Sequence, residues 1–354
     1  MRVSNLKRQA SRITLILIGL FLCFTRDNAC AQSHPEFQKG ICYATWDKTR
    51  YSSAESDISI KSFAEAGGEW IAIVSTVYQD KAYTTKIFST AKTPSDSSVI
   101  HAIQYAHSLG LKVMLKPHLD LQNTEGGGWR GEISYSTEAG WEEWFASYAE
   151  TILHYAKMAQ ENGVEIFCIG TELTSVATTK EKLWREKIIA PAREVYKGAL
   201  TYAANWNEEY RYIKFWDALD YVGIDAYFPL SDNDKPNLDE IKLGWVKWVQ
   251  DLDEFLAKVK KPVIFPEVGY CSADGAARTP WEELVTNKVN LQLQADCYEA
   301  LFGVFWEKKW FYGVYWWRWG TDTRFGGPSN KAFTPQNKPA AEVIKKWYKL
   351  PSPR

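Results

Sequence analysis

Two glutamates, Glu172 and Glu267, each follow a short apolar run of the sequence. The run before Glu172 is Ile166-Phe-Cys-Ile-Gly-Thr, and the run before Glu267 is Val263-Ile-Phe-Pro. A continuous apolar run of this length indicates a strand that is covered on both faces, as in parallel sheets. Two such strands, each with a glutamate at the same end, predict one shared site with two carboxyl groups.

Two carboxyl groups in one site are what glycoside hydrolysis needs. One protonates the leaving oxygen, and the other attacks the anomeric carbon or activates a water molecule. Glu172 and Glu267 fit these two roles. The alternative interpretation is that each glutamate only pairs with a lysine or arginine at a strand end. Because few cations follow the other predicted strands, we favour catalysis.

The elements that must position these residues alternate regularly along the chain. Apolar runs predict strands at 40–44, 70–74, 112–116, 165–170, 199–204, 221–224, 263–266 and 313–317. Amphipathic segments predict helices at 56–66, 95–109, 138–161, 180–196, 207–219, 238–259, 281–308 and 339–348. Eight such units predict an α/β fold of one domain, a (β/α)8 TIM barrel. The alternative is a doubly wound open sheet, but no glycine-rich phosphate motif follows the first strand.

In a barrel of this kind, reactive side chains lie at the carboxyl ends of the strands. Polar and aromatic residues at these ends are the predicted substrate-binding residues, namely Trp46, Tyr78, His118, Asp120, Asn205, Trp206, Asp225, Tyr227 and Trp316. The Tyr227 hydroxyl either donates to the nucleophile carboxylate or caps a loop. His118 and Asp120 suggest a metal site as an alternative. Such sites usually need three or more ligands, so we expect hydroxyl binding and no metal or cofactor.

The chain contains 17 tryptophans. The flat rings of Trp46 and Trp316 at strand ends suit the apolar faces of sugar rings, so we expect these two to be sugar platforms. Other tryptophans at helical spacing are expected to pack in the core, namely Trp245, Trp248, Trp281, Trp306 and Trp310.

Residues 1–31 have the features of a secretory signal peptide. Basic residues precede an apolar run at 13–24, and Ala29-Cys30-Ala31 offers a cleavage site. An uncleaved anchor and a lipoprotein signal at Cys30 are the alternatives, although the apolar run is short for a membrane span. We therefore expect a catalytic domain at 32–354 that is secreted or periplasmic.

The formal net charge of −1 gives no field that would attract nucleic acid or an anionic membrane. The expected partner is an uncharged substrate, and the protein is expected to be a monomer without a stable membrane partner. Four cysteines remain after the predicted cleavage, Cys42, Cys168, Cys271 and Cys297. Their spacing matches no metal motif, which favours buried free thiols over a disulfide framework.

Several motifs together resemble glycoside hydrolase family 113, within the large clan of retaining glycosidases on (β/α)8 barrels. They are Lys39-Gly-Ile-Cys-Tyr-Ala-Thr-Trp46, Leu115-Lys-Pro-His-Leu-Asp120, Ile169-Gly-Thr-Glu-Leu173, Thr201-Tyr-Ala-Ala-Asn-Trp206, Gly223-Ile-Asp-Ala-Tyr-Phe-Pro229 and Pro266-Glu-Val-Gly-Tyr270. The resemblance covers nearly all of the predicted mature chain. It implies an endo-acting β-1,4-mannanase, with Glu172 as acid/base and Glu267 as nucleophile in a double displacement on mannan, glucomannan or manno-oligosaccharides.

Other members of this clan cleave other β-linked polysaccharides with the same two acids, and a non-catalytic carbohydrate-binding protein is a further alternative. Much of the clan has an asparagine directly before the acid/base, where it binds the substrate 2-hydroxyl. This chain has Thr171 there, so Asn205 and His118 become the candidates for that contact. We also expect apolar surroundings to keep Glu172 protonated for the first step.

Overall fold

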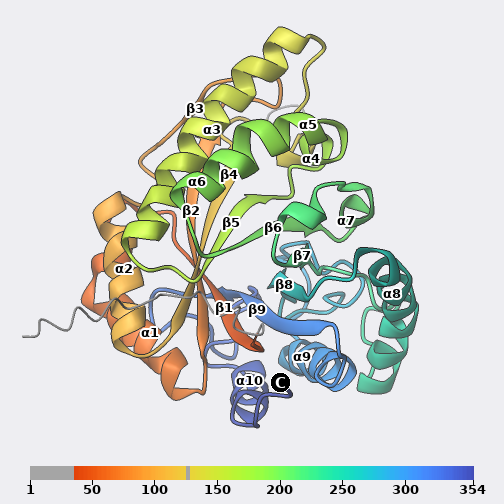
Figure 1. Cartoon of the computed structure of the whole chain (residues 1–354). Coiled ribbons are helices and arrows are strands. Elements are labelled where there is room, and N and C mark those ends of the chain that lie inside the picture. The colour runs from red at the N-terminus through yellow and green to blue at the C-terminus, as the bar shows by residue number, and fades with distance from the viewer. Residues whose placement is uncertain (1–35, 125–127) are drawn as a thin grey trace, which may run out of the picture. The chain divides into compact units, whose positions relative to one another are not determined.

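The computed structural model describes residues 36–124 and 128–354. Eight parallel strands close into a barrel in the order β1-β9-β8-β7-β6-β5-β4-β2, and pairing of β1 with β2 completes the ring (Figure 1). The strands are β1 (Gln38–Ala44), β2 (Trp70–Gln79), β4 (Lys112–Leu121), β5 (Ile166–Thr171), β6 (Ala199–Asn205), β7 (Val222–Asp225), β8 (Val263–Val268) and β9 (Phe311–Trp319). A short strand, β3 (Ile87–Phe88), pairs antiparallel with the end of β2. The predicted (β/α)8 barrel is confirmed.

The helices lie around the outside of the barrel (Figure 1). They are α1 (Ala54–Glu65), α2 (Asp96–Ser108), α3 (Glu138–Glu161), α4 (Thr174–Thr179), α5 (Glu181–Leu183), α6 (Ala190–Val195), α7 (Glu209–Tyr212), α8 (Leu238–Val259), α9 (Leu291–Phe305) and α10 (Pro339–Tyr348). A π-helical segment (Trp184–Ile189) joins α5 to α6, and 3₁₀ turns lie at Arg50–Ser52, Arg130–Glu132 and Trp216–Ala218. The predicted bounds of α3, α8 and α10 are correct.

Two predicted helices differ from the structure. The segment 207–219 contains only α7 and a 3₁₀ turn. The helix predicted from Trp281 begins ten residues later, where the Asn290 side chain accepts a hydrogen bond from the Leu293 N–H (3.0 Å) and caps α9. Because the residues before this cap form turns, Trp281 lies in a loop on the way from β8 to α9.

The apolar core has two parts because side chains of a strand alternate between the two faces of the sheet. On β4, Val113 and Leu115 pack outward with the helices, whereas Met114 fills the barrel interior together with residues such as Cys42, Ala72 and Tyr315. The same alternation places the polar side chains of Lys116, His118 and Asp120 on the inner face above Met114. One strand thus supplies both the floor of the barrel and part of the site above it.

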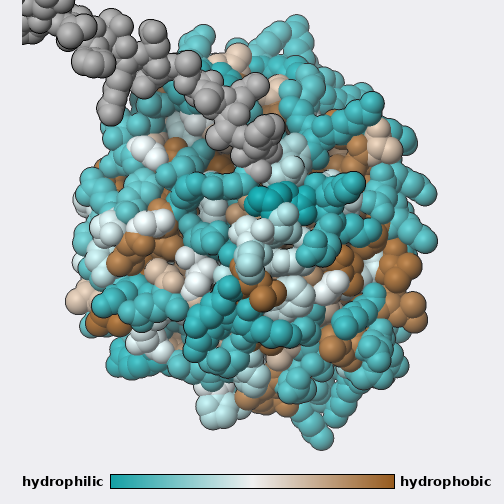
Figure 2. Space-filling view, turned by 60° about the horizontal axis from the view of Figure 1, so that its bottom comes forward, coloured by the Kyte–Doolittle hydropathy of each residue, from teal (hydrophilic) through white to brown (hydrophobic). Residues whose placement is uncertain are grey.

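The four cysteines of the described residues, Cys42, Cys168, Cys271 and Cys297, are buried and free, as predicted. The predicted signal peptide at 1–31 lies outside the described residues. In the described part of the chain, no helix is both long and apolar enough to cross a membrane. On the face shown in Figure 2, hydrophilic residues predominate and hydrophobic residues form small separate patches.

Candidate active site

Glu172 and Glu267 line one cleft of about 560 Å³. Glu172 directly follows β5, and Glu267 lies near the end of β8, three places away around the barrel. The other residues that line the cleft are Trp129, Arg130, Asn205, Trp206, Asn207, Tyr227, Trp281, Glu283, Trp317 and Phe333. The sequence-based prediction that the two glutamates share one site agrees with this arrangement.

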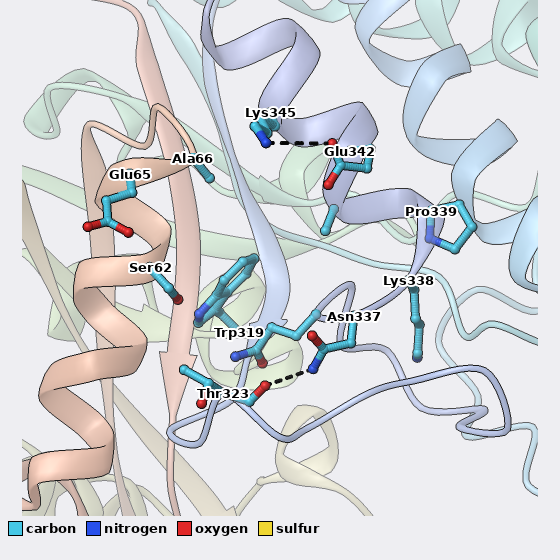
Figure 3. A pocket seen from close by; sticks show the side chains of 12 residues that line it. Ser62, Glu65, Ala66, Trp319, Thr323, Asn337, Lys338, Pro339, Glu342 and Lys345 are labelled. Carbon is cyan, nitrogen blue, oxygen red and sulfur yellow. Dashed lines mark hydrogen bonds and ion pairs between the residues drawn. The ribbon is translucent and has the colours of Figure 1, made fainter.

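A second hollow, of about 810 Å³, lies between α1 and α10 (Figure 3). Its two acids are Glu65 on α1 and Glu342 on α10, which lie on opposite sides of the hollow. Glu342 pairs with Lys345 on its own helix (3.8 Å), and Glu65 pairs with Lys61 (3.9 Å). Since these carboxylates do not converge, this hollow lacks the paired acids of the cleft.

The Glu267 carboxylate has three polar partners. Lys116 Nζ donates to Oε1, His118 Nε2 lies 3.2 Å from the same oxygen, and the Tyr227 hydroxyl donates to Oε2 (3.0 Å). Burial alone would raise the pKa of Glu267, but the Lys116 charge and the hydrogen bonds from His118 and Lys116 hold this pKa well below its ordinary value. Glu267 is therefore ionised at neutral pH. Of the two interpretations of Tyr227, donation to this carboxylate is confirmed.

His118 is neutral over most of the pH range. Burial and the neighbouring Lys116 charge lower the pKa of its imidazole to about 4. Its ring stacks against Trp317, with centroids 6.0 Å apart and an interplanar angle of 10°. His118 thus connects the nucleophile candidate to an aromatic wall of the cleft.

Asp225 does not line the cleft, so its prediction as a substrate-binding residue is wrong. It pairs in register with Glu267 across β7 and β8, but its side chain is completely buried. Its Oδ2 lies 3.7 Å from Lys116 Nζ. Burial raises the pKa of Asp225 well above its ordinary value, although Lys116 acts in the opposite direction. Lys116 Nζ is thus close to two buried carboxyl groups, those of Asp225 and Glu267.

Glu172 has polar partners, and the expectation of apolar surroundings is wrong. Asn205 Nδ2 donates to its Oε1 (2.7 Å), and Arg130 donates to its Oε2 (3.1 Å). The same guanidinium lies 3.4 Å from Asp120, which therefore contacts the site through Arg130. Thr171, the residue before Glu172, is buried, whereas Asn205 lies beside the carboxyl group. Asn205 thus remains a candidate for the substrate 2-hydroxyl.

Of the two predicted sugar platforms, Trp316 is wrongly placed, and Trp46 does not itself line the cleft. Trp46 is 38% exposed, lies beside Trp317 with ring centroids 6.4 Å apart, and has Arg318 over its ring (4.6 Å). Trp206 lines the cleft as expected. Trp316, however, is completely buried and stacks on Tyr298 outside the barrel (3.7 Å). The alternation of β9 directs Trp317 inward and Trp316 outward, so the tryptophan of this strand that lines the cleft is Trp317.

Tyr78 and Trp281 also differ from expectation. Tyr78 is buried where β2 pairs with Phe88 of β3 and Asp120 of β4, and it does not line the cleft. Trp281 is expected to pack in the core, but it is 45% exposed and lines the cleft. Its ring stacks on Trp206 with centroids 5.0 Å apart and an interplanar angle of 19°. The Trp206–Trp281 pair forms a second aromatic surface in the cleft.

Sequence reasoning missed several residues of the site. Lys116 could have been found, because it precedes His118 by two positions and must share its face of the strand. Trp129 and Arg130 lie in the long segment after β4, and Glu283 and Phe333 lie in the loops after β8 and β9. These loop residues follow no periodic pattern that would have identified them.

A closed (β/α)8 barrel with two carboxyl groups in a cleft at its strand ends is the arrangement that glycoside hydrolases on this fold use. The sequence matches glycoside hydrolase family 113 over residues 42–338, and the chain belongs to this family. A comparison with curated protein sequences finds no match.

Solved structures of family 113 members are similar to this chain. A β-1,4-mannanase of the family, solved as a complex, is 31% identical with a TM-score of 0.79, over 89% of this chain and 100% of that one. The β-mannanase AaManA of Alicyclobacillus acidocaldarius is 30% identical with a TM-score of 0.78, over 88% of this chain and 97% of that one. A Faecalibacterium prausnitzii β-glucuronidase shares only the fold, with 14% identity and a TM-score of 0.61, over 90% of this chain and 50% of that one.

Proposed function

We propose that this glycoside hydrolase cleaves β-1,4-mannosidic bonds in mannan, glucomannan and manno-oligosaccharides with retention of configuration. The observation on which the mechanism rests is the state of Glu267, a carboxylate held ionised by Lys116, His118 and Tyr227 in the cleft that it shares with Glu172. An ionised carboxylate is the nucleophile of a retaining glycosidase or the general base of an inverting one. The resemblance of the Glu172 and Glu267 motifs to the retaining clan favours the nucleophile. The choice of mannan is supported by the family 113 structures at 30–31% identity, which are described as β-1,4-mannanases or β-mannanases.

The proposed reaction is a double displacement. Glu267 attacks the anomeric carbon while Glu172 gives its proton to the leaving oxygen, and a glycosyl ester forms as the rest of the polysaccharide leaves. Glu172 then takes a proton from water, which attacks the same carbon and releases Glu267. Arg130 and Asn205 contact the two oxygens of Glu172 and would stabilise the carboxylate that exists between the two steps.

The test is release of reducing ends by the purified mature protein from linear β-1,4-mannan, glucomannan, xylan and cellulose. We expect release from the first two substrates, with losses of about 10²–10⁴-fold or more in Glu172→Ala and Glu267→Ala. Proton NMR of the first product should show the β-anomer. Release only from xylan or cellulose would contradict the choice of substrate, and an α-anomer would contradict retention.

The site of action is proposed from the N-terminal sequence alone. The basic start, the apolar run and the Ala29-Cys30-Ala31 motif support export by a signal peptide that is cleaved after Ala31. Mass spectrometry of the exported protein should find Gln32 at its N-terminus. An intact 1–31 segment, or a lipid on Cys30, would contradict this assignment.

A further inference from the structure

Glu209 is a buried carboxyl group behind the cleft. It begins α7, four residues after the last residue of β6, and only 1% of its surface is exposed. Three groups donate hydrogen bonds to it. The Tyr202 hydroxyl donates to Oε1 (2.6 Å), while the Asn205 backbone N–H (2.7 Å) and the Thr174 hydroxyl (3.0 Å) donate to Oε2. Since Glu209 does not line the cleft, it does not touch the substrate.

All three donors are connected to Glu172. The Leu173 N–H, next in the chain after Glu172, donates to the Tyr202 hydroxyl (2.7 Å), so the Tyr202 proton is directed to Glu209. Thr174 is the second residue after Glu172. Asn205 is held at its backbone by Glu209, and its side chain donates to Glu172 Oε1 (2.7 Å). The Glu209 carboxyl group therefore joins the end of β5 to the end of β6.

The backbone of Glu172 needs such support. Its φ angle is +51°, in the left-handed region that residues with a Cβ atom rarely adopt. A conformation of this kind persists only where the surrounding structure holds it. The Glu172 N–H donates to the Ala203 carbonyl (2.8 Å), the Leu173 N–H donates to the Tyr202 hydroxyl, and the Thr174 hydroxyl donates to Glu209.

We propose that Glu209 is a positioning residue, which fixes the direction of the Glu172 side chain through Tyr202, Thr174 and Asn205. The inference rests on the proposed role of Glu172 as general acid and base. Packing alone would not favour a carboxyl group at this place, because burial of such a group is costly. Burial raises the pKa of Glu209, whereas the hydrogen bonds from Tyr202, Asn205 and Thr174 lower it, because they stabilise the ionised form that accepts all three.

The experiment compares two leaving groups in Glu209→Gln, which has nearly the same shape but cannot accept all three hydrogen bonds. Mannopentaose needs a proton on its leaving oxygen, whereas 2,4-dinitrophenyl β-mannobioside does not. Since kcat/KM reports the first chemical step, we expect it to fall by about 10²-fold for mannopentaose. For the dinitrophenyl substrate we expect a change of less than about threefold in kcat/KM. The second step still needs Glu172 as a general base, so Glu209→Gln should lower kcat for this substrate. Azide, which attacks without a general base, should restore that kcat.

Two further variants make the result specific. Tyr202→Phe removes the hydroxyl between Leu173 and Glu209 and should show the same dependence on the leaving group. Gln336→Leu is the matched control, because Gln336 is also a buried polar residue, but it joins Gly320 to Ser59 away from the cleft. This control should lower Tm and change kcat/KM for both substrates by the same factor.

Glu172→Ala in the same assays separates the role of Glu172 from that of Glu209. If Glu172→Ala reduces kcat/KM equally for both substrates and azide has no effect, the proposed role of Glu172 is wrong. The other outcome concerns Glu209. If the loss of kcat/KM in Glu172→Ala depends on the leaving group, but Glu209→Gln lowers kcat/KM equally for both substrates or for neither, the proposed role of Glu209 is wrong.

Discussion

Lys116 supplies the positive charge that keeps Glu267 ionised. Both side chains are buried, and Lys116 is also 3.7 Å from the buried Asp225. A charge in such a place is stable only beside an opposite charge, so the lysine and the two carboxyl groups form one electrostatic unit. The carboxylates raise the pKa of Lys116 even though burial opposes this. Lys116 therefore acts as a fixed cation and not as a base.

Replacement of Lys116 by methionine removes this charge and keeps the length of the side chain. The pKa of Glu267 should then rise, because burial would no longer be offset by the cation. The acid limb of the kcat/KM profile should move to higher pH, and kcat/KM at neutral pH should fall by about 10²-fold or more. The control is Lys112→Met, which alters an exposed lysine of the same strand that pairs with Glu36. An acid limb that stays in place in Lys116→Met would contradict this view of the cation.

At the scale of elements, the strands were predictable and the loops were not. Parallel strands are covered on both faces, so each appears in the sequence as a continuous apolar run that ends at a polar residue. This pattern located β5 and β8 and with them Glu172 and Glu267. The same pattern does not show which of two adjacent side chains points inward. The apolar run does not distinguish Trp316 from Trp317, because their directions depend on the register of β9.

The residues of the loops could not be predicted for a different reason. Trp281 lies at a spacing from later apolar residues that also fits a helix, but the Asn290 cap starts α9 ten residues later. Arg130 and Trp129 lie in a segment whose conformation depends on contacts with other parts of the chain, such as that between Arg130 and Glu172. Information of this kind is tertiary and is not present in local periodicity.

The two tryptophans whose placements differ from expectation give a paired prediction. Trp281→Ala removes an exposed ring of the cleft and should raise KM for mannan, with a change of less than about 1 kcal/mol in the free energy of unfolding. Trp316→Ala removes a completely buried ring and should lower this free energy by about 3–5 kcal/mol. Urea titrations and mannan kinetics of both variants check this. The opposite pattern, with Trp281→Ala the more destabilising, would contradict the positions of both rings.

At the scale of the whole molecule, stability comes from the closed barrel and its covering helices. The interior of the barrel and the space between strands and helices each hold a buried cluster of apolar side chains. A chain of this length buries enough surface to fold without covalent links. The free cysteines fit this description, since Cys42 and Cys168 fill the barrel interior as small apolar residues.

Burial should also make these thiols unreactive in the native protein. It raises the pKa of Cys168 and that of Cys271 to about 11, and it raises the pKa values of Cys42 and Cys297 well above the ordinary range. The thiolate is the reactive form, so both exposure and ionisation are unfavourable. We expect intact-mass measurements to show no alkylation by iodoacetamide in buffer and alkylation of all four cysteines of the mature chain in guanidinium. A reductant should leave Tm unchanged, because no disulfide holds the described residues together. Rapid alkylation of the native protein would contradict the burial of these thiols. A Tm lowered by dithiothreitol would contradict their free state.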